Sequence, residues 1–331
     1  MTDKTLNRRD VLRGTAATGV GLAAAGSGLS AFAQDNPDVA LPTGKAGTLT
    51  VIQRQEYFEA AQTALRGIVE NFAKTNNIGL DISTTNAESF GDFLGKLTAA
   101  VKAGNPPDLA YTSNVSISQM HLLGLVEDVT DVVEEAISKY GNVMTGINAE
   151  PNAKFDGKWA AIPFIANTTG YFIRGDKLKE QSIDPTTLKT FGDRREAALK
   201  ISDPDNKFWG WGLTPNQSGD GYGFLILVIQ AFGGHYTDES GMKVQFDSPE
   251  TVAAVTWLAE TYDRKGKYGP MLPPGVESWN DTGNNEAYLA GNIGYTHNAF
   301  SVYAQAKRDN NPVFPGTTLL PAPTANNGDS R

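Results

Sequence analysis

The spacing of apolar residues changes between two periods along the chain from residue 48 onward. Thr48–Ile52 is rich in β-branched residues and predicts a strand, and apolar residues then recur at helical spacing from Phe58 to Phe72. The same reasoning predicts a second strand at Leu80–Thr84, a second helix at Phe90–Val101 and a third strand at Asp108–Tyr111. Strands that alternate with helices indicate a mostly parallel sheet with helices on both faces.

The pattern changes after a helix predicted at Asp131–Tyr140. Asp156-Gly157 stands between apolar residues, which is a strong signal for a two-residue hairpin. Two apolar runs, Trp159–Pro163 and Gly170–Ile173, then flank the polar residues 167–169. We interpret this segment as a crossover between two lobes.

Strands and helices alternate again downstream. Tyr222–Phe232 predicts an apolar helix, and Ser248-Pro249 predicts the start of another, with serine as the cap and proline at the first helical position. The residues that we expect on the buried face of that later helix are Val252, Val255, Ala259 and Tyr262. Further strands are expected at 293–295 and 317–320. The two predicted lobes, the second including the crossover, span residues 47–154 and 155–323.

The first residues have the pattern of an export signal. Arg8-Arg9 precedes a mildly apolar stretch, Gly14–Ala31, that ends in the small-x-small motif Ala31-Phe32-Ala33. This pattern resembles a twin-arginine (Tat) signal and predicts cleavage after Ala33. Because no cysteine follows to carry a lipid, we expect a free periplasmic protein. The predicted terminal segments are a signal peptide at 1–33, a flexible N-terminus at 34–46 and a tail at 324–331.

Composition narrows the possible classes of function. The 331 residues are 40% hydrophobic and 20% charged, as in a globular protein, and they contain no apolar run of the roughly 18 residues that a retained membrane helix needs. The absence of cysteine excludes disulfides and thiolate metal sites, and three histidines leave little room for a histidine-rich centre. We therefore predict no metal and no cofactor. The net charge of −9 disfavours nucleic acid as a partner.

Candidate ligand contacts follow from topology. In open α/β sheets, ligands bind outside the carboxyl ends of the strands, so the residues just past each predicted strand are the candidates. In the first lobe these are Gln53, Gln55, Glu56, Tyr57, Thr112, Ser113 and Asn114. In the second lobe they are Asn167, Asp220, Tyr222, Trp279, Asn280 and Asn298. Such a mixture of amides, hydroxyls, single carboxylates and aromatic rings suits the hydroxyl groups and C–H faces of a sugar.

Several of these residues also have purely structural interpretations. Trp279 could pack in the core, Asn114 could cap the helix that follows it, and Asn167 could serve a turn. Asp220 precedes an apolar helix, so it is either a helix cap or a ligand contact. Gly219-x-Gly221-x-Gly223 lacks the full spacing and the preceding strand of a nucleotide-binding loop, so we do not interpret it as one.

Catalysis finds little support in the sequence. It contains no His-Glu-x-x-His, no Gly-x-Ser-x-Gly and no paired metal-ligand spacing. A glycosidase that uses two of Glu56, Asp220 and Glu277 stays open as an alternative, because the sequence does not give the separation of these carboxylates. A non-sugar solute, such as an amino acid derivative or a polyamine, also stays open. Acidic contacts would then pair with ammonium groups.

An ordered set of short motifs resembles one family of proteins. The motifs are Pro106-Pro107-Asp108-Leu109, Leu123-Gly124-Leu125-Val126-Glu127-Asp128, Gly157-Lys158-Trp159-Ala160-Ala161-Ile162-Pro163, Asn167-Thr168-Thr169-Gly170-Tyr171-Phe172, Phe246-Asp247-Ser248-Pro249-Glu250 and Leu289-Ala290-Gly291-Asn292-Ile293-Gly294. In this order, from Gly47 to Pro323, the chain resembles the family 1 extracellular solute-binding proteins of ABC importers, which include maltose- and glycerol-phosphate-binding proteins.

The resemblance implies a fold and a function. The fold is α/β and two-lobed, of the periplasmic binding protein type II-like kind, with mostly parallel sheets flanked by helices. Such a protein captures a carbohydrate or polyol between its lobes and delivers it to the permease subunits of an ABC transporter in the inner membrane. It acts as a monomer and is not an enzyme.

Two features depart from the family pattern. Many sugar-binding members have Asn-Gly-Pro-Trp where this chain has His297-Asn298-Ala299-Phe300, so only the asparagine carries over and Trp279 becomes the better stacking candidate. In the family the chain then returns to the first lobe, adds a strand and helices there, and ends in helices that brace both lobes. We expect those C-terminal elements to be missing and the chain to be a fragment.

Overall fold

The computed structural model describes residues 47–85, 90–111, 115–143, 149–166, 168–238 and 243–324. The predictions that lie outside the described residues are the signal peptide at 1–33, the N-terminal segment 34–46, the tail 324–331 apart from Thr324, and the candidates Thr112, Ser113, Asn114 and Asn167. The chain divides into two compact units, Met1–Ala166 (unit 1) and Asn167–Arg331 (unit 2). This division falls within the segment that the sequence identifies as a crossover.

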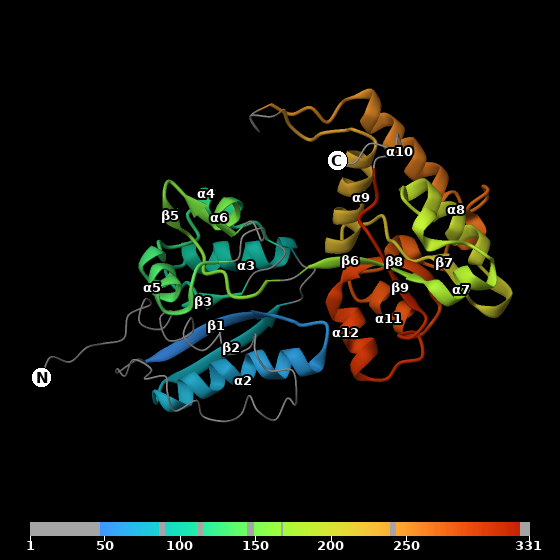
Figure 1. Cartoon of the computed structure of the whole chain (residues 1–331). Helices are drawn as coiled ribbons and strands as arrows, with labels where there is room; N and C mark the ends of the chain where they lie inside the picture. The colour runs from blue at the N-terminus through green and yellow to red at the C-terminus, as the bar shows by residue number, and fades with distance from the viewer. Residues whose placement is uncertain are drawn as a thin grey trace, which may run out of the picture. The chain divides into compact units, whose positions relative to one another are not determined.

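Unit 1 opens with the five elements that the apolar periodicity predicts. They are β1 (Thr48–Arg54), α2 (Glu59–Thr75), β2 (Gly79–Thr85), α3 (Phe90–Lys102) and β3 (Leu109–Ala110). The strands form a sheet in the order β2-β1-β3, and both pairings are parallel, as expected (Figure 1). The carboxyl ends of the three strands therefore lie at one edge of this sheet.

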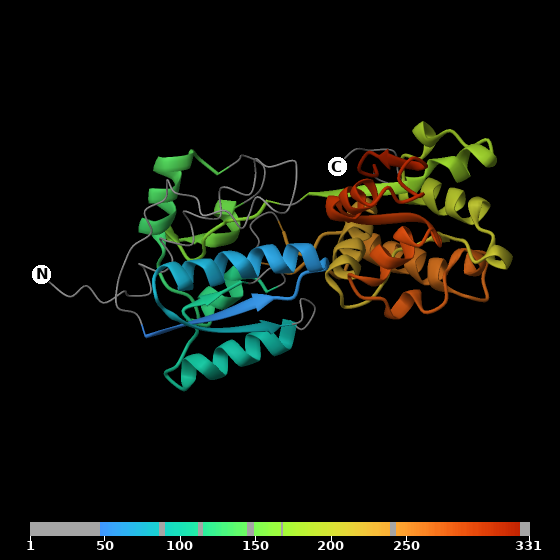
Figure 2. The same cartoon turned by 90° about the horizontal axis from the view of Figure 1, so that it is seen from below.

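Helices cover the two faces of this sheet. Leu49 and Val51 of β1 pack with the apolar residues of α2, whereas Ile52, the next residue along the strand, packs with Phe93 and Leu97 of α3. This alternation follows from the period of two along a strand. Figure 2 shows α2 and α3 on opposite sides of β1 and β2. The prediction of a parallel sheet covered on both faces is thus confirmed in unit 1.

The rest of unit 1 contains short helices and the predicted hairpin. Its elements are α4 (Ile117–Leu122), α5 (Thr130–Tyr140), α6 (Ala149–Ala153), β4 (Lys154–Phe155) and β5 (Lys158–Trp159). Strands β4 and β5 pair antiparallel across Asp156 and Gly157, whose φ angles are 50° and 79°. Two positive φ angles are what a type I′ turn requires, so the hairpin prediction is confirmed.

Unit 2 contains a four-stranded sheet and six α-helices within the described residues. The elements are β6 (Thr169–Arg174), α7 (Gly175–Glu180), α8 (Phe191–Ile201), β7 (Trp209–Trp211), α9 (Gly219–Ala231), α10 (Pro249–Tyr262), α11 (Gly283–Leu289), β8 (Ile293–Ala299), α12 (Phe300–Arg308) and β9 (Thr317–Leu320). Short 3₁₀ helices lie at Pro185–Thr187, Pro204–Asn206, Gly269–Met271 and Val276–Ser278.

The sheet of unit 2 is mixed, with the strand order β7-β8-β6-β9. Strands β7 and β8 are parallel, but β6 runs antiparallel to both β8 and β9. The expectation of a mostly parallel sheet is therefore wrong for this unit. Side-chain patterns indicate where a strand lies and which face is buried, whereas strand direction depends on the path of the connections, which the pattern does not encode.

Both faces of this sheet are buried. Tyr171 and Ile173 of β6 belong to the large core that α8, α9 and α10 complete, and Phe172 between them packs on the other face with Tyr288 of α11 and Val302 of α12. Figure 1 shows α8, α9 and α10 on one side of this sheet and α11 and α12 on the other. Apolar packing on both faces thus fixes the position of the sheet that carries the carboxyl ends of β7 and β8.

The buried face of α10 differs from the expectation. Ser248 caps the helix as predicted, because its Oγ accepts a hydrogen bond from the Thr251 backbone N–H at 3.2 Å. However, Val252 and Val255 are 60% and 50% exposed. The buried residues are Thr251, Ala254, Trp257, Leu258 and Thr261. The two stripes have the same helical spacing, and the helix turns its largest side chain, Trp257, into the core.

None of the helices in the described ranges has the length and apolarity that crossing a membrane would demand.

Candidate ligand-binding site

The first group of candidate contacts follows β1 in unit 1. Gln53 lies near the end of the strand with only 5% of its surface exposed, and its Oε1 has no hydrogen-bond partner among the described residues. The Gln55 backbone N–H donates to the Thr85 carbonyl at 2.7 Å, which continues the β1–β2 pairing past the end of the strand. Gln55 is exposed. The backbone thus places Gln53 in the interior and Gln55 at the surface.

An ion pair holds Glu56 at the end of β1. Arg54 Nη2 lies 2.7 Å from Glu56 Oε2, and the two side chains are 14% and 10% exposed. Burial opposes the charge on Arg54, but the hydrogen bond to Glu56 helps to raise the pKa of the guanidinium. The Glu56 backbone N–H donates to Gln62 Oε1 at 2.8 Å, which ties this loop to α2. Glu56 is therefore a paired carboxylate.

Aromatic rings border this ion pair. The Arg54 guanidinium carbon lies 4.9 Å from the centre of the Tyr57 ring and 5.4 Å from that of Tyr111. Tyr111 in turn meets Phe164 edge to face at 4.9 Å. Burial raises the pKa of Tyr111 to about 12, so its hydroxyl stays protonated at neutral pH. The cluster therefore combines a charge-balanced pair with apolar ring surfaces.

Sequence reasoning missed three members of this cluster: Arg54, Tyr111 and Phe164. Arg54 is the last residue of β1 and lies between the candidates Gln53 and Gln55, but it was not chosen because the candidates were amides, hydroxyls, carboxylates and aromatic rings. Tyr111 follows β3, which ends one residue earlier than predicted. Phe164 is far from both in sequence and lies in an irregular segment, so no local pattern indicates its contact with Tyr111.

The second group of candidates lies in unit 2. Because β7 and β8 are parallel, their carboxyl ends lie at the same edge of the sheet. The chain leaves β7 and enters α9, which places Asp220 in the first helical turn. Asn298 is the penultimate residue of β8 and is buried. Topology therefore brings Asp220 and Asn298 to one edge, as the sequence predicts.

Side chains from α11 and the residues before it join these two candidates. Asn284 Nδ2 donates to Asp220 Oδ2 at 2.7 Å, and the Asp220 backbone N–H donates to Asp281 Oδ1 at 2.8 Å. Asn285 Nδ2 donates to the Asp281 carbonyl at 2.9 Å, and Asn285 Oδ1 accepts a hydrogen bond from Asn298 Nδ2. We call these five residues the amide network. It connects three segments that are distant in sequence.

The other candidates of unit 2 have different surroundings. Trp279 is partly buried and packs against both apolar clusters of the unit, and its carbonyl accepts a hydrogen bond from Asn216 Nδ2. Asn280 Oδ1 accepts a hydrogen bond from the Gly283 backbone N–H at 3.0 Å, at the start of α11. Tyr222 is 60% exposed on α9. Trp279 and Asn280 thus lie on the segment that leads into the amide network.

Close contacts account for two of the three glycines at the start of α9, Gly219 and Gly221. A Cβ on Gly219 would lie 2.7 Å from Asp281 Oδ2, and a Cβ on Gly221 would lie 2.5 Å from the Asn216 carbonyl oxygen. Ser218 caps the helix by accepting a hydrogen bond from the Gly221 backbone N–H at 3.0 Å. Gly219 and Gly221 therefore let neighbouring segments approach the helix.

Three network members were missed from the sequence: Asp281, Asn284 and Asn285. All three are almost fully buried, although polar residues in a short helix are typical of a solvent-exposed face. A local cue exists in retrospect, because Asn280 to Asn285 is a dense run of polar residues beside the candidate Trp279. Their hydrogen-bond partners lie on other segments and cannot be derived from spacing.

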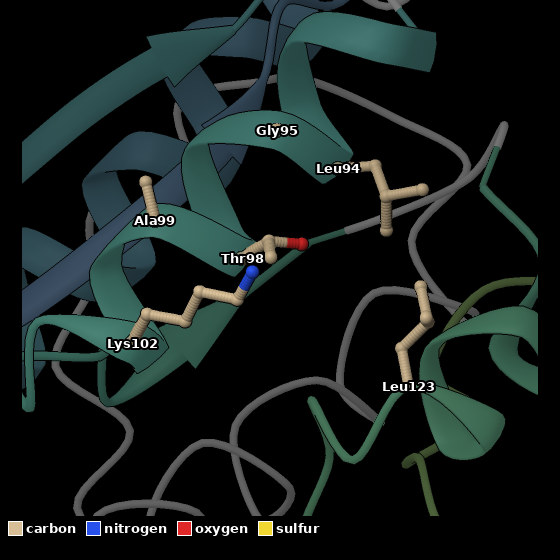
Figure 3. Close-up of a pocket in the computed structure, with 6 residues that line it drawn as sticks. All are labelled: Leu94, Gly95, Thr98, Ala99, Lys102 and Leu123. Atoms are coloured by element: carbon tan, nitrogen blue, oxygen red, sulfur yellow. The ribbon is translucent and has the colours of Figure 1, made fainter.

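Other chemistry in the described residues is sparse. No group of three or more His, Asp or Glu side chains there is arranged to hold a metal ion. A shallow hollow of about 480 Å³ lies in unit 1 between α3 and the end of α4, with Leu94 and Leu123 on its two sides (Figure 3). Its described lining residues include none of the candidate contacts. The candidate contacts therefore form two separate groups: the β1 cluster of unit 1, which consists of Arg54, Glu56, Tyr57, Tyr111 and Phe164, and the amide network of unit 2.

Solved structures share the fold of this chain. A solute-binding protein of an ABC transporter from Agrobacterium radiobacter, in complex with ribitol, matches with a TM-score of 0.69 and 20% identity over 84% of this chain and 67% of that one. One from Thermotoga lettingae, bound to α-D-tagatose, matches with a TM-score of 0.67 and 19% identity over 86% and 69%. One from Agrobacterium vitis, with bound D-mannitol, matches with a TM-score of 0.63 and 19% identity over 86% and 65%. The two-lobed α/β fold is thereby confirmed.

Sequence comparison identifies the family. A maltotriose-binding protein from Pyrococcus abyssi is 26% identical over 170 residues, which is 51% of this chain. The match spans only 34% of that relative's length. The family model for bacterial extracellular solute-binding proteins matches residues 67–330, which is most of the chain. The chain therefore belongs to the bacterial extracellular solute-binding protein family.

Proposed function

We propose that the protein is the solute-binding component of an ABC importer, which binds a neutral carbohydrate or polyol and delivers it to permease subunits in the membrane. The engagement of both candidate carboxylates by protein groups carries this proposal. Glu56 is paired with Arg54, and the Asp220 carboxylate is held by the Asn284 amide. A polyamine would require acidic groups that are available to ammonium groups, whereas sugar hydroxyls match amides and hydrogen-bonded carboxylates.

The relatives support the same class of ligand. The similar structures hold ribitol, tagatose and mannitol, which are uncharged and rich in hydroxyl groups. The rings of Tyr57, Tyr111 and Phe164 offer apolar surface to the C–H faces of such a ligand. Phe164 is 46% exposed, so part of this ring surface is accessible in the ligand-free protein.

A glycosidase is less well supported. Glu277 pairs with Arg264 at 2.7 Å. Burial tends to raise the pKa of Glu277, but the hydrogen bond and charge of Arg264 together with a backbone hydrogen bond outweigh burial, so the pKa is lowered. A general acid at neutral pH needs the opposite shift, a raised pKa. We therefore propose binding without catalysis.

We also propose that the protein is exported through the Tat pathway, is cleaved after Ala33 and acts as a monomer in the periplasm. The arginine pair Arg8-Arg9 supports the choice of pathway. Replacing both arginines by lysine should leave the precursor in the cytoplasm, as cell fractionation would reveal. Normal periplasmic accumulation of the double variant would argue for the general secretory route.

A thermal-shift screen on the mature protein tests the binding function. The panel contains ribitol, D-mannitol, tagatose and maltose, with putrescine, spermidine and glutamate as charged comparators. A ligand at 100 times its Kd stabilises the folded state by about 2.7 kcal/mol, which is a measurable rise in Tm. We expect a rise with one or more of the neutral compounds. A rise with the polyamines alone would replace the sugar by a cationic ligand.

A further inference from the structure

Asp220 is fixed at two points by the residues that begin at Asp281. Its Oδ2 accepts a hydrogen bond from Asn284 at 2.7 Å, and its backbone N–H donates to the Asp281 carboxylate at 2.8 Å. A carboxylate is planar, so anchoring one oxygen and the backbone nitrogen restricts the direction of the second oxygen. The absence of a side chain at Gly219 allows Asp281 to approach this closely.

The orientation of the Asn284 amide leaves one of its buried polar atoms without a hydrogen bond. Asn284 is 1% exposed, and its Oδ1 has no hydrogen-bond partner among the described residues. Rotating the amide by half a turn would place Oδ1 against Asp220 Oδ2, so that two acceptors would face each other. A buried acceptor without a partner is unfavourable, and a purely structural position would be served better by an apolar residue. The amide therefore has a role that stability alone does not explain.

The same short helix also reaches the second candidate contact of unit 2. Asn285, the neighbour of Asn284, accepts a hydrogen bond from Asn298 and donates to the Asp281 carbonyl. Helix α11 thus joins a residue at the start of α9 to a residue at the end of β8. Neither Asn284 nor Asn285 carries a charge, so both hold their partners without neutralising a carboxylate.

We propose that Asn284 is a positioning residue, which orients the Asp220 carboxylate to accept hydrogen bonds from the hydroxyl groups of a neutral ligand. This inference rests on the proposed function and names the group that makes the site selective for hydroxyl donors. An amide at 284 aligns Asp220 and places no charge beside it. A carboxylate at 284 would repel it, and an apolar residue would leave it unaligned.

The substitution Asn284→Asp tests the proposal through the pH dependence of binding. At neutral pH the new carboxylate faces Asp220 and repels it, and we expect the affinity for the neutral probes to fall at least about tenfold. Two close carboxylates share a proton at lower pH, which restores a hydrogen bond between them. We therefore expect the deficit to shrink towards pH 4.5. Calorimetric titrations of ribitol, D-mannitol and maltose between pH 4.5 and 8 measure the effect.

Asn206→Asp is the matched control. Asn206 Nδ2 donates to Asp203 Oδ2 at 2.7 Å, so the same amide–carboxylate contact is replaced by the same pair of carboxylates. This pair is exposed and lies on a surface 3₁₀ helix. The control variant should bind as the wild type does at every pH.

A swapped pair, Asp220→Asn with Asn284→Asp, separates positioning from folding. It rebuilds an amide–carboxylate hydrogen bond with the charge on the other residue, so the melting temperature should recover from that of Asn284→Asp. Affinity should stay low, because the carboxylate is no longer at 220. A swapped variant that binds as tightly as the wild type would overturn the proposal even if Asn284→Asp alone fails to fold.

The outcomes distinguish this inference from the proposed function. Wild-type protein that binds none of the three probes would overturn the proposed function, and the positioning role would fall with it. If the wild type binds a probe and the affinity of Asn284→Asp changes with pH in parallel with that of the wild type, the positioning role alone is overturned. A deficit at neutral pH that shrinks on acidification supports both.

Discussion

Unit 1 and unit 2 hold their candidate contacts by different means. In unit 1, Arg54 and Glu56 are two residues apart and pair with each other, and aromatic rings cover the pair. In unit 2, Asp220 is held by residues that follow it by more than 60 positions, and the contacts are amide hydrogen bonds. The first arrangement depends on charge and local geometry. The second depends on the tertiary fold.

The apolar cores of the two units also differ, in the size of their clusters. In unit 1 the described apolar residues form separate clusters on the two faces of the sheet and beside the hairpin. In unit 2 one large cluster extends from the sheet to α8, α9 and α10, and Trp279 packs against it. We therefore expect changes at the contacts of unit 1 to act through the buried ion pair, whereas changes in unit 2 should act through the packing of its large apolar core.

Removing the charge that balances Glu56 should have the largest effect. Arg54→Ala leaves a carboxylate that is 10% exposed without its ion-pair partner. Breaking a largely buried pair from one side costs about 3 kcal/mol, and we expect that loss in urea unfolding of the ligand-free protein. Binding of the neutral ligand should be lost with it, because Tyr57 and Tyr111 both pack on the guanidinium.

Arg66→Ala is the matched control for this prediction. Arg66 pairs with Glu70 at the same 2.7 Å, but both side chains are about half exposed on α2. An exposed pair of this kind contributes less than about 0.5 kcal/mol. Equal losses for Arg54→Ala and Arg66→Ala would show that burial does not distinguish the two pairs, and the comparison between the units would lose its basis.

In unit 2 the strongest pH dependence should come from His297. This side chain stacks on Tyr171 with ring centres 4.4 Å apart, and burial, assisted by the charge of Arg194, lowers its pKa from 6.5 to about 4. The unfolded chain takes up a proton as the pH falls below 6.5, while the folded chain resists until about pH 4. Stability is therefore complete above pH 6.5 and decreases by about 3 kcal/mol between these values.

His297→Phe tests this assignment. Phenylalanine keeps a ring on Tyr171 and cannot be protonated. The decrease in unfolding free energy between pH 6.5 and 4 should therefore be smaller than in the wild type, by most of the about 3 kcal/mol that His297 contributes. Urea titrations at intervals of half a pH unit provide the measurement. Identical pH profiles for the variant and the wild type would assign the acid sensitivity to other groups.

How much of this could be predicted from the sequence differs between the units. Periodicity located the strands, and the search for residues past strand ends gave Glu56, Asp220 and Asn298 as candidates, because it needs only the position at which a strand ends. It did not find Asn284, since a buried amide in a helix is recognised by a partner on another segment. The antiparallel pairings of β6 were missed for a similar reason, because direction is a property of the chain path.

Trp279 tests the link between contacts and core in unit 2. Its side chain packs against both apolar clusters, so Trp279→Ala should lower the unfolding free energy by about 2 kcal/mol, less than a fully buried tryptophan would cost. Trp279→Phe should recover most of the stability. Calorimetry on both variants separates the roles: an affinity deficit that persists in the stable phenylalanine variant would assign the loss to a contact of the indole with the ligand and not to folding.

The smallest effect is expected for a substitution on the outer face of α10, at the edge of the core of unit 2. Val252 faces outward on α10 with 60% of its surface exposed, although the apolar spacing favours its burial, so Val252→Ala should change the unfolding free energy by less than about 0.5 kcal/mol. Val228→Ala removes the same two methyl groups from a fully buried position on α9 and should cost about 2 kcal/mol. Urea unfolding of the two variants measures the difference. A large loss at Val252 would mean that its side chain is covered in solution, and the outer face of α10 would then belong to an interface that the single chain does not contain.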